Sequence, residues 1–178
     1  MITVISGTNR PDSRTLLFAT HFVEQLTELG QAAQLLDLAE VKLELFVREM
    51  YDASKMAPDL KNLQRQYISE VKKLVFFVPE YNGSYPGVLK LFLDGISVNE
   101  YSRNFKGKYV ALAGVASGRA GNLRGMDHLS ASIGYMGAWV LPNKLPLSNI
   151  EAMLTDGKLT DESTISALKS LAEQLIAA

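Results

Sequence analysis

Cysteine is absent from this sequence of 178 residues. Its absence excludes disulfide bonds, thiolate metal ligands, a cysteine nucleophile and a redox-active dithiol, so any redox chemistry has to come from a bound cofactor. Histidine is scarce, and both His21 and His128 fall in helical stretches, where they are expected to pack or to face water. Asp12, Asp94 and Asp127 lack the spacing of metal ligands, so we predict no metal site.

Long apolar runs and blocks of like charge are missing too. The apolar runs at 74–78 and 109–116 are far too short to cross a bilayer, and the amino terminus has no signal-peptide pattern. Lys and Arg number 18 against 19 Asp and Glu, which leaves no single-sign field to attract nucleic acid or anionic lipid. We therefore expect a cytoplasmic protein with no membrane or nucleic-acid partner.

The sequence does contain a regular alternation of strand and helix patterns. Short apolar runs bounded by Gly, Pro, Asn or charged residues predict five buried strands, at 2–5, 33–38, 73–78, 108–115 and 138–141. Helical spacing of apolar residues predicts helices at 16–29, 59–71, 86–98, 123–136 and 161–176. This alternation indicates one doubly wound α/β domain over residues 1–178, with a five-stranded parallel sheet covered on both faces.

Three loops that follow predicted strands are rich in Gly, Ser, Asn, Thr and Arg. They span residues 6–15, 79–86 and 115–125. In open α/β sheets, ligands bind beyond the carboxyl ends of the strands. With the strand order 2-1-3-4-5 these three loops would converge on one edge of the sheet, which makes that edge the candidate site.

The first loop, S-G-T-N-R-P-D-S-R-T, leads into a helix whose free N–H groups and dipole favour an anion. Thr8, Ser13 and Thr15 offer hydroxyls and Arg10 offers a forked cation, which together predict a phosphate cradle. Neither G-x-x-x-x-G-K-[ST] nor G-x-G-x-x-G follows the first strand, and a phosphatase loop would need a cysteine nucleophile. The plainer alternative is that Ser13 caps the helix and Arg10 is a solvated surface charge.

The second loop lies within F-V-P-E-Y-N-G-S-Y-P-G-V-L-K, where Pro79 and Pro86 stiffen the two ends of a flexible turn. With the first loop, it resembles two motifs of the NADPH-dependent FMN reductase family, G-[ST]-x-R-x-x-S and P-E-Y-N-G-S-x-P-G-x-L-K. The third loop, V-A-S-G-R-A-G-N-L-R-G, is similar to the family's S-x-G-x-x-G-G element. The resemblance covers essentially the whole chain. It implies the flavodoxin-like fold, with strand order 2-1-3-4-5, and a reductase of quinones, chromate or azo dyes.

The resemblance also implies the contacts of the cofactor. The positions that match FMN phosphate ligands are Thr8, Arg10, Ser13 and Thr15. Those that match the loops around the isoalloxazine ring are Pro79, Glu80, Tyr81, Asn82, Gly83 and Ser84, with Ser117, Gly118, Arg119, Ala120 and Gly121 at its other edge. The chain departs from the family pattern at Thr15, where Asn is common, at Leu91 in L-K-L-F-L-D, and at Asn122, where a second Gly is common. Leu91 and Asn122 bear on dimer packing and nicotinamide access.

The chemistry then belongs to the flavin, which takes a hydride from a nicotinamide and passes on one or two electrons. We predict an FMN-dependent oxidoreductase that uses NADPH or NADH to reduce quinones or similar small acceptors. No side chain is assigned a catalytic role, and Glu80 is treated as a partner for an arginine. The alternative is a non-enzymatic flavodoxin-like electron carrier or a flavin-binding regulatory module, although such carriers are usually strongly acidic.

Assembly and core packing are the last expectations. Relatives in this family form dimers or tetramers, and we expect a homodimer or homotetramer here. Apolar surface beside the second loop would come from Tyr85, Leu91, Phe92 and Tyr101. Trp139 is assigned to the core.

Overall fold

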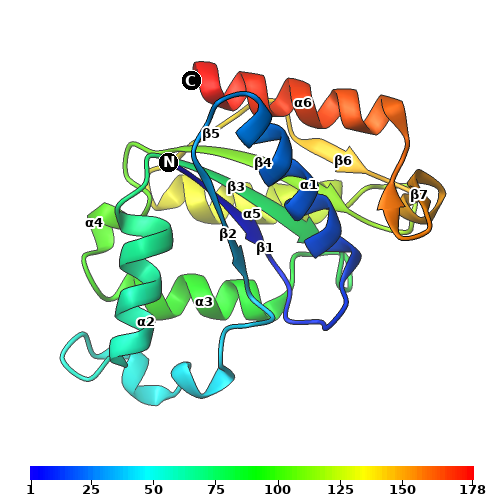
Figure 1. Ribbon diagram of the computed structural model, residues 1–178. Coiled ribbons are helices and arrows are strands. Elements are labelled where there is room, and N and C mark those ends of the chain that lie inside the picture. Colours follow the sequence, from blue (N-terminus) through cyan, green and yellow to red (C-terminus); the bar gives the residue numbers. More distant parts are fainter.

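The computed structural model describes residues 1 to 178 and is built on one parallel sheet (Figure 1). Its main strands are β1 (Ile2–Ser6), β2 (Ala33–Asp37), β3 (Lys73–Pro79), β4 (Tyr109–Val115) and β5 (Trp139–Val140). They follow the order β2-β1-β3-β4-β5, which confirms the predicted flavodoxin-like sheet. Ser6 pairs with Phe77 and Pro79 pairs with Val115, so the carboxyl ends of β1, β3 and β4 lie together.

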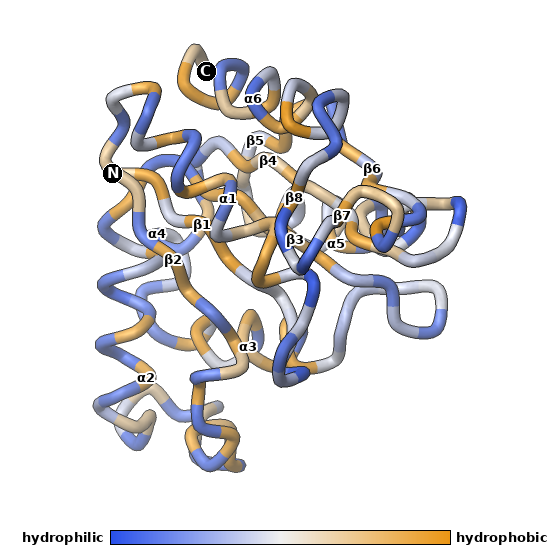
Figure 2. Tube along the Cα trace, turned by 45° about the vertical axis from the view of Figure 1, so that its right-hand side comes forward, coloured by the Kyte–Doolittle hydropathy of each residue, from blue (hydrophilic) through white to orange (hydrophobic).

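Helices cover both faces of this sheet (Figure 1). α1 (Arg14–Glu28) and α6 (Glu162–Ala177) lie on one face, and α3 (Gly87–Ser97) and α5 (Leu123–Tyr135) lie on the other. Successive side chains of β3 point to opposite faces, so Phe77 packs with α1 and α6 while Phe76 packs on the side of α3 and α5. Figure 2 shows the same division, with apolar strands inside and helices that alternate between apolar and polar residues.

The fifth strand differs from its prediction. The run at 138–141 forms only the short β5, and a second short strand, β6 (Leu145–Leu147), pairs with β4 further along. Pro142, which has no N–H to donate, lies in the break between them. Trp139 is 65% exposed at this edge of the sheet, so its assignment to the core is wrong.

The predicted helix at 59–71 consists of two elements. α2 (Pro58–Leu63) runs directly into η3 (Gln64–Ser69), which has π-helical hydrogen bonding. Lys108 is buried at the end of η3, where its Nζ donates to the carbonyl oxygens of Ile68 and Ser69. Burial away from water lowers the pKa of Lys108 to about 8, because the charged ammonium loses its hydration there.

Several short elements are additional to the predicted ones. They are the 3-10 helices η1 (Leu43–Leu45), η2 (Arg48–Tyr51) and η4 (Ile150–Met153), the helix α4 (Tyr101–Asn104), and the hairpin β7 (Leu154–Thr155) with β8 (Lys158–Leu159). None of the helices combines the length and the apolar character that a membrane crossing requires. Of these short elements, η4 adjoins the carboxyl edge of the sheet and takes part in the site described next.

Candidate functional site

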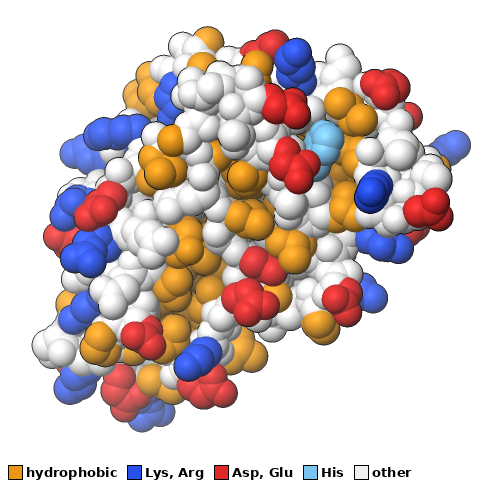
Figure 3. All heavy atoms as spheres, viewed as in Figure 1, with side chains coloured by type: hydrophobic (Ala, Val, Ile, Leu, Met, Phe, Trp, Pro, Cys, Tyr) orange, Lys and Arg blue, Asp and Glu red, His pale blue; other side chains and the backbone are white.

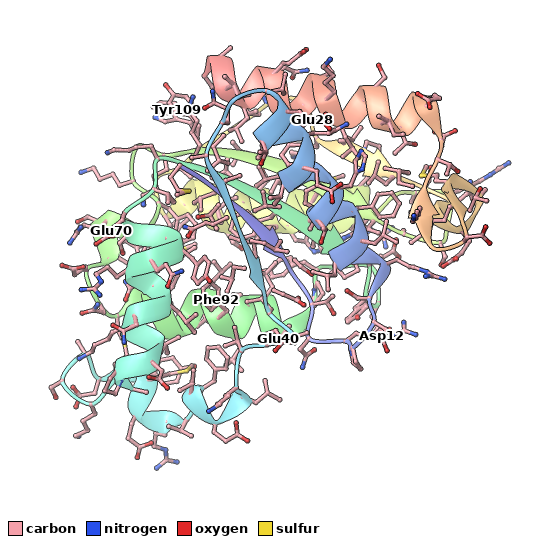
Figure 4. All side chains as sticks on the ribbon, in the orientation of Figure 1. Asp12, Glu28, Glu40, Glu70, Phe92 and Tyr109 are labelled. Atoms are coloured by element: carbon pink, nitrogen blue, oxygen red, sulfur yellow. The ribbon has the colours of Figure 1, made fainter.

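A cleft of about 560 Å³ opens at the carboxyl edge of the sheet, beyond β1, β3 and β4. Each of the three loops singled out in the sequence contributes to its wall, and η4 contributes a further side. The lining residues are Arg10, Pro11, Asp12, Ser13, Arg14, Thr15, Pro79, Glu80, Tyr81, Val115, Ala116, Ser117, Ile150 and Glu151. The expected convergence of the loops is therefore present. Asp12 marks the loop that enters α1, at the end of this helix opposite Glu28 (Figure 4).

The first loop presents the amino terminus of α1 to the cleft. Ser13 is the N-cap, and its hydroxyl accepts a hydrogen bond from the Leu16 N–H at 3.2 Å, so the capping alternative is confirmed for this residue. Thr15 is buried and lines the cleft beside it. Arg10 is exposed, and only its backbone N–H donates a hydrogen bond within the chain. Its guanidinium fork is therefore available at the rim of an electropositive helix end.

Thr8 has a different place from the other predicted cradle residues. Its side chain is fully buried, and its Oγ1 lies 2.7 Å from the Tyr81 hydroxyl oxygen. The same oxygen accepts the backbone N–H of Arg10 at 3.2 Å. Thr8 therefore ties the first loop to the second and does not itself line the cleft.

The second loop is a tight Asn-Gly turn. Tyr81 and Ser84 exchange backbone hydrogen bonds at 3.0 and 3.1 Å, and both Asn82 and Gly83 have positive φ, as a two-residue turn of this kind requires. Ser84 Oγ lies 2.9 Å from Nδ1 of His128, so the turn rests against α5. Of these turn residues only Tyr81 lines the cleft, and the other three lie beyond its wall.

Pro79 and Glu80 form the base of the second loop, and both line the cleft. The Glu80 N–H donates to the Val115 carbonyl oxygen at 3.2 Å, which joins the bases of the second and third loops. The expectation that Glu80 pairs with an arginine is wrong. The ion pair at this cleft joins Arg14 and Glu151 instead.

Arg14 and Glu151 were not assigned to the site from the sequence. Arg14 is the first residue of α1, and its Nε and Nη2 donate to the two carboxylate oxygens of Glu151 at 3.2 Å each. Glu151 belongs to η4, which is far along the chain. Arg14 stands inside the first loop, directly after the last residue of the G-[ST]-x-R-x-x-S motif, so the sequence did offer a signal for it. No local pattern marks Glu151.

The third loop passes from the cleft to the surface. Ser117 lines the cleft, whereas Gly118, Arg119 and Ala120 are exposed beyond it. Gly121 closes the loop with a φ of +54°, and a Cβ at this position would lie 2.5 Å from the Cβ of Pro146. Only glycine fits there, because both the backbone angle and the nearby proline of β6 exclude a side chain.

Asn122, one of the departures from the family pattern, joins the second and third loops. It is almost fully buried and adopts a φ of +59° at the N-cap of α5. Its Oδ1 accepts the Gly125 N–H at 3.1 Å, and its Nδ2 donates to the carbonyl oxygens of Val78 and Pro79 at 2.9 Å each. The side chain therefore fixes the start of the second loop against the helix that follows the third.

Another hollow, of about 620 Å³, shares Asp12, Ser13 and Arg14 with this cleft, but its other lining residues belong to α1 and to the β7–β8 hairpin and none comes from the second or third loop. A groove of about 480 Å³ lies between β2 and α2, with Leu35, Leu45, Leu63 and Tyr67 in its lining. Apolar side chains are visible over this region in Figure 3. The lining of this groove includes no residue of β1, β3 or β4. The structure has no group of three or more His, Asp or Glu placed to hold a metal ion. The cleft of the three loops is the candidate site.

Comparison with known proteins identifies the family of the chain. Residues 1–152 match the model of the NADPH-dependent FMN reductase family, and this range includes all four sides of the cleft. The chain is 27% identical over 164 residues to an NADPH azoreductase of Bacillus sp. (strain OY1-2), covering 91% of this chain and 83% of that protein. It is 28% identical over 183 residues to a 2-hydroxy-1,4-benzoquinone reductase of Burkholderia sp., covering 99% and 94%.

Solved structures show the same fold. FerB, a flavoenzyme NAD(P)H:(acceptor) oxidoreductase from Paracoccus denitrificans, superposes with a TM-score of 0.79 at 23% identity, covering 99% of this chain and 94% of that one. A flavodoxin from the domain Archaea superposes with a TM-score of 0.59 at 12% identity, covering 99% and 97%. The family match spans well over half of the sequence and includes each loop of the cleft. The chain belongs to the NADPH-dependent FMN reductase family.

Proposed function

We propose that the protein is an FMN-dependent NAD(P)H oxidoreductase that delivers electrons to quinones, azo compounds or similar small acceptors. The observation that carries this proposal is the cleft of about 560 Å³, where the three loops of the family motifs meet the amino terminus of α1. The named activities of the related azoreductase and benzoquinone reductase support the class of acceptor. Bound FMN supplies the hydride and electron transfer, and the chain has to hold and orient it.

The phosphate end of the cofactor belongs at the start of α1 in this proposal. Free N–H groups and the helix dipole stabilise an anion there, and Ser13 and Thr15 add hydroxyl groups. Arg10 supplies a guanidinium group that forms no hydrogen bond or ion pair with another residue of the chain. Thr8 acts indirectly, because its buried hydroxyl holds Tyr81 and the Arg10 backbone. These donors fit a phosphate monoester, which accepts several charge-assisted hydrogen bonds at once.

The ring end of the cofactor belongs between the second and third loops. Pro79, Glu80 and Tyr81 offer one wall and Ser117 offers another. We assign the outer residues of these loops, Asn82, Gly83, Ser84, Gly118, Arg119 and Gly121, to the rim around the ring. Asn122 and the Glu80 N–H keep the two loops at a constant separation, so that a planar ligand meets a preformed slot.

The bound flavin is expected to be FMN and not FAD. The cradle at α1 serves one phosphate, and the chain has no second glycine fingerprint for an adenylate. Extraction of the bound flavin followed by chromatography separates the two cofactors. FAD as the predominant species would contradict the assignment.

The activity is tested with purified protein saturated with FMN. Under anaerobic conditions NADPH should bleach the flavin absorbance, and benzoquinone should then restore it. A flavin that binds but is not reduced by NADPH or NADH would instead favour an electron carrier. Protein that binds no flavin at micromolar FMN would refute the assignment of the cleft.

We further propose that the protein is a homodimer at least, and that it works in the cytoplasm. A groove of about 480 Å³ between α3 and α5 includes Tyr101, and the neighbouring Tyr135 is 87% exposed. Leu91 is partly buried on the same side, and the Tyr85 hydroxyl lies 3.3 Å from Ser132 Oγ. Phe92 is fully buried, so its assignment to the apolar surface is wrong. Light scattering that gave a monomer mass at micromolar concentration, with activity intact, would contradict the dimer. Cell fractionation tests the location.

A further inference from the structure

The ion pair between Arg14 and Glu151 lies in the wall of the proposed FMN cleft. Both guanidinium nitrogens that face the carboxylate are engaged, each at 3.2 Å from an oxygen. Arg14 is also the first residue of α1, so its charge stands at the electropositive end of the helix. An anion that binds at this helix end therefore meets a cation that a carboxylate already holds.

The carboxylates that line the cleft oppose the binding of a phosphate while Glu151 is paired with Arg14. Two guanidinium groups, Arg10 and Arg14, face three carboxylates, Asp12, Glu80 and Glu151. Of these carboxylates, only Glu151 forms an ion pair with a lining arginine. While it does so, the Nε–Nη2 edge of the Arg14 guanidinium is occupied, and the carboxylate repels the incoming dianion.

The ion pair is of a kind that exchanges easily. The side chains of Arg14 and Glu151 are 48% and 62% exposed, and such pairs contribute little to stability because water screens them. A phosphate accepts the same forked hydrogen bonds from an arginine and carries more charge than a carboxylate. We propose that Glu151 is an internal competitor for the FMN phosphate, and that the phosphate replaces it on Arg14 when FMN binds. The proposal rests on the FMN-binding function given above.

Replacement of Glu151 by phosphate on Arg14 also affects the third loop, because the segment that carries Glu151 is hydrogen-bonded to it. The Asn149 N–H, directly before η4, donates to the Gly118 carbonyl oxygen at 3.3 Å, and the Ile150 N–H donates to that of Ala116 at 3.4 Å. Glu151 follows immediately, so the element that carries it is bonded to the loop on the other side of the cleft. A phosphate on Arg14 thus releases a contact that joins α1 to the third loop through η4.

The test is a fluorescence titration of Glu151→Gln with FMN and with riboflavin, which has the same ring and no phosphate. Gln keeps the size of the side chain and removes its charge. We expect the variant to bind FMN about two- to fivefold more tightly than wild type, the scale of an exposed ion pair, and to bind riboflavin with unchanged affinity. Glu28→Gln is the matched control, because it removes the same charge at the far end of α1 (Figure 4) and should alter neither affinity.

A second variant shows whether the effect acts through Arg14. In an Arg14→Gln background, Glu151→Gln should no longer tighten FMN binding, because the contested fork is gone. The proposal is overturned if Glu151→Gln leaves FMN affinity unchanged or weakens it, or if riboflavin gains equally. A wild-type protein that binds no FMN would refute the proposed function as well. A protein that binds FMN tightly with no response to Glu151→Gln refutes only the competition.

Discussion

Replacing Asn122 by Gly tests how the second and third loops are held together. The change removes one accepted and two donated hydrogen bonds of a side chain that is 1% exposed. At about 0.5–1.5 kcal/mol net for each bond, and with two carbonyl oxygens left without this partner, we expect a loss of about 2–4 kcal/mol. Glycine accepts the φ of +59° without strain, so backbone conformation adds little to this loss.

The measurement is urea unfolding of the flavin-free protein, followed by circular dichroism. In a separate thermal scan, for a chain of this length, the same loss corresponds to a decrease in Tm of about 4–16 °C. Asn122→Ala serves as the control, because it loses the same hydrogen bonds and also places a Cβ in the left-handed region. It should be less stable than the Gly variant by about 1 kcal/mol. If Asn122→Gly unfolds within about 0.5 kcal/mol of wild type, the side chain is not the tie that its contacts indicate.

Changes at Arg10, Lys108 and Gly121 test the phosphate cradle, a buried charge and the close approach of the third loop to β6. Arg10→Ala should weaken FMN binding by about one to two orders of magnitude with little change in stability, and the FMN affinity of Arg10→Lys should fall between those of wild type and Arg10→Ala. Equal titration curves for all three proteins would show that Arg10 is a solvated surface charge. Because the pKa of Lys108 is lowered to about 8, the folded state binds fewer protons than the unfolded state above that pH. Unfolding free energy should therefore rise between about pH 8 and 10.5 relative to Lys108→Met, and parallel pH profiles would contradict this. Gly121→Ala places a Cβ 2.5 Å from that of Pro146 at a positive φ, so thermal unfolding should show a loss of about 2 kcal/mol or more, and a wild-type Tm would contradict it.

Much of the fold could be predicted from the sequence because the patterns that mark strands and helices lie in short stretches of neighbouring residues. Buried parallel strands need continuous apolar runs, and the helices that cover them need one apolar face, so both patterns are visible in short windows. The ligand edge follows from the same argument, since every parallel strand ends there. Short, distinctive loop motifs then identified the family without reference to tertiary structure.

Other features depend on contacts between distant segments. The break between β5 and β6 leaves Trp139 at a sheet edge, although its apolar sequence context is the same as that of a core strand. Asn122 is a departure from the motif when it is considered alone, and its hydrogen bonds to the second loop appear only after folding.

The phosphate end of the cleft shows this division most clearly. The residues of the first loop were assigned together because a strand followed by a hydroxyl-rich helix start has a local physical meaning. Glu151 has no such local meaning, because a carboxylate in a short 3-10 helix is ordinary in sequence. Local sequence therefore predicts hydroxyl and guanidinium donors for an anion in the first loop. The ion pair of Arg14, a residue next to those donors that was left unassigned, depends on the folded chain, because only folding brings Glu151 of η4 within 3.2 Å of its guanidinium.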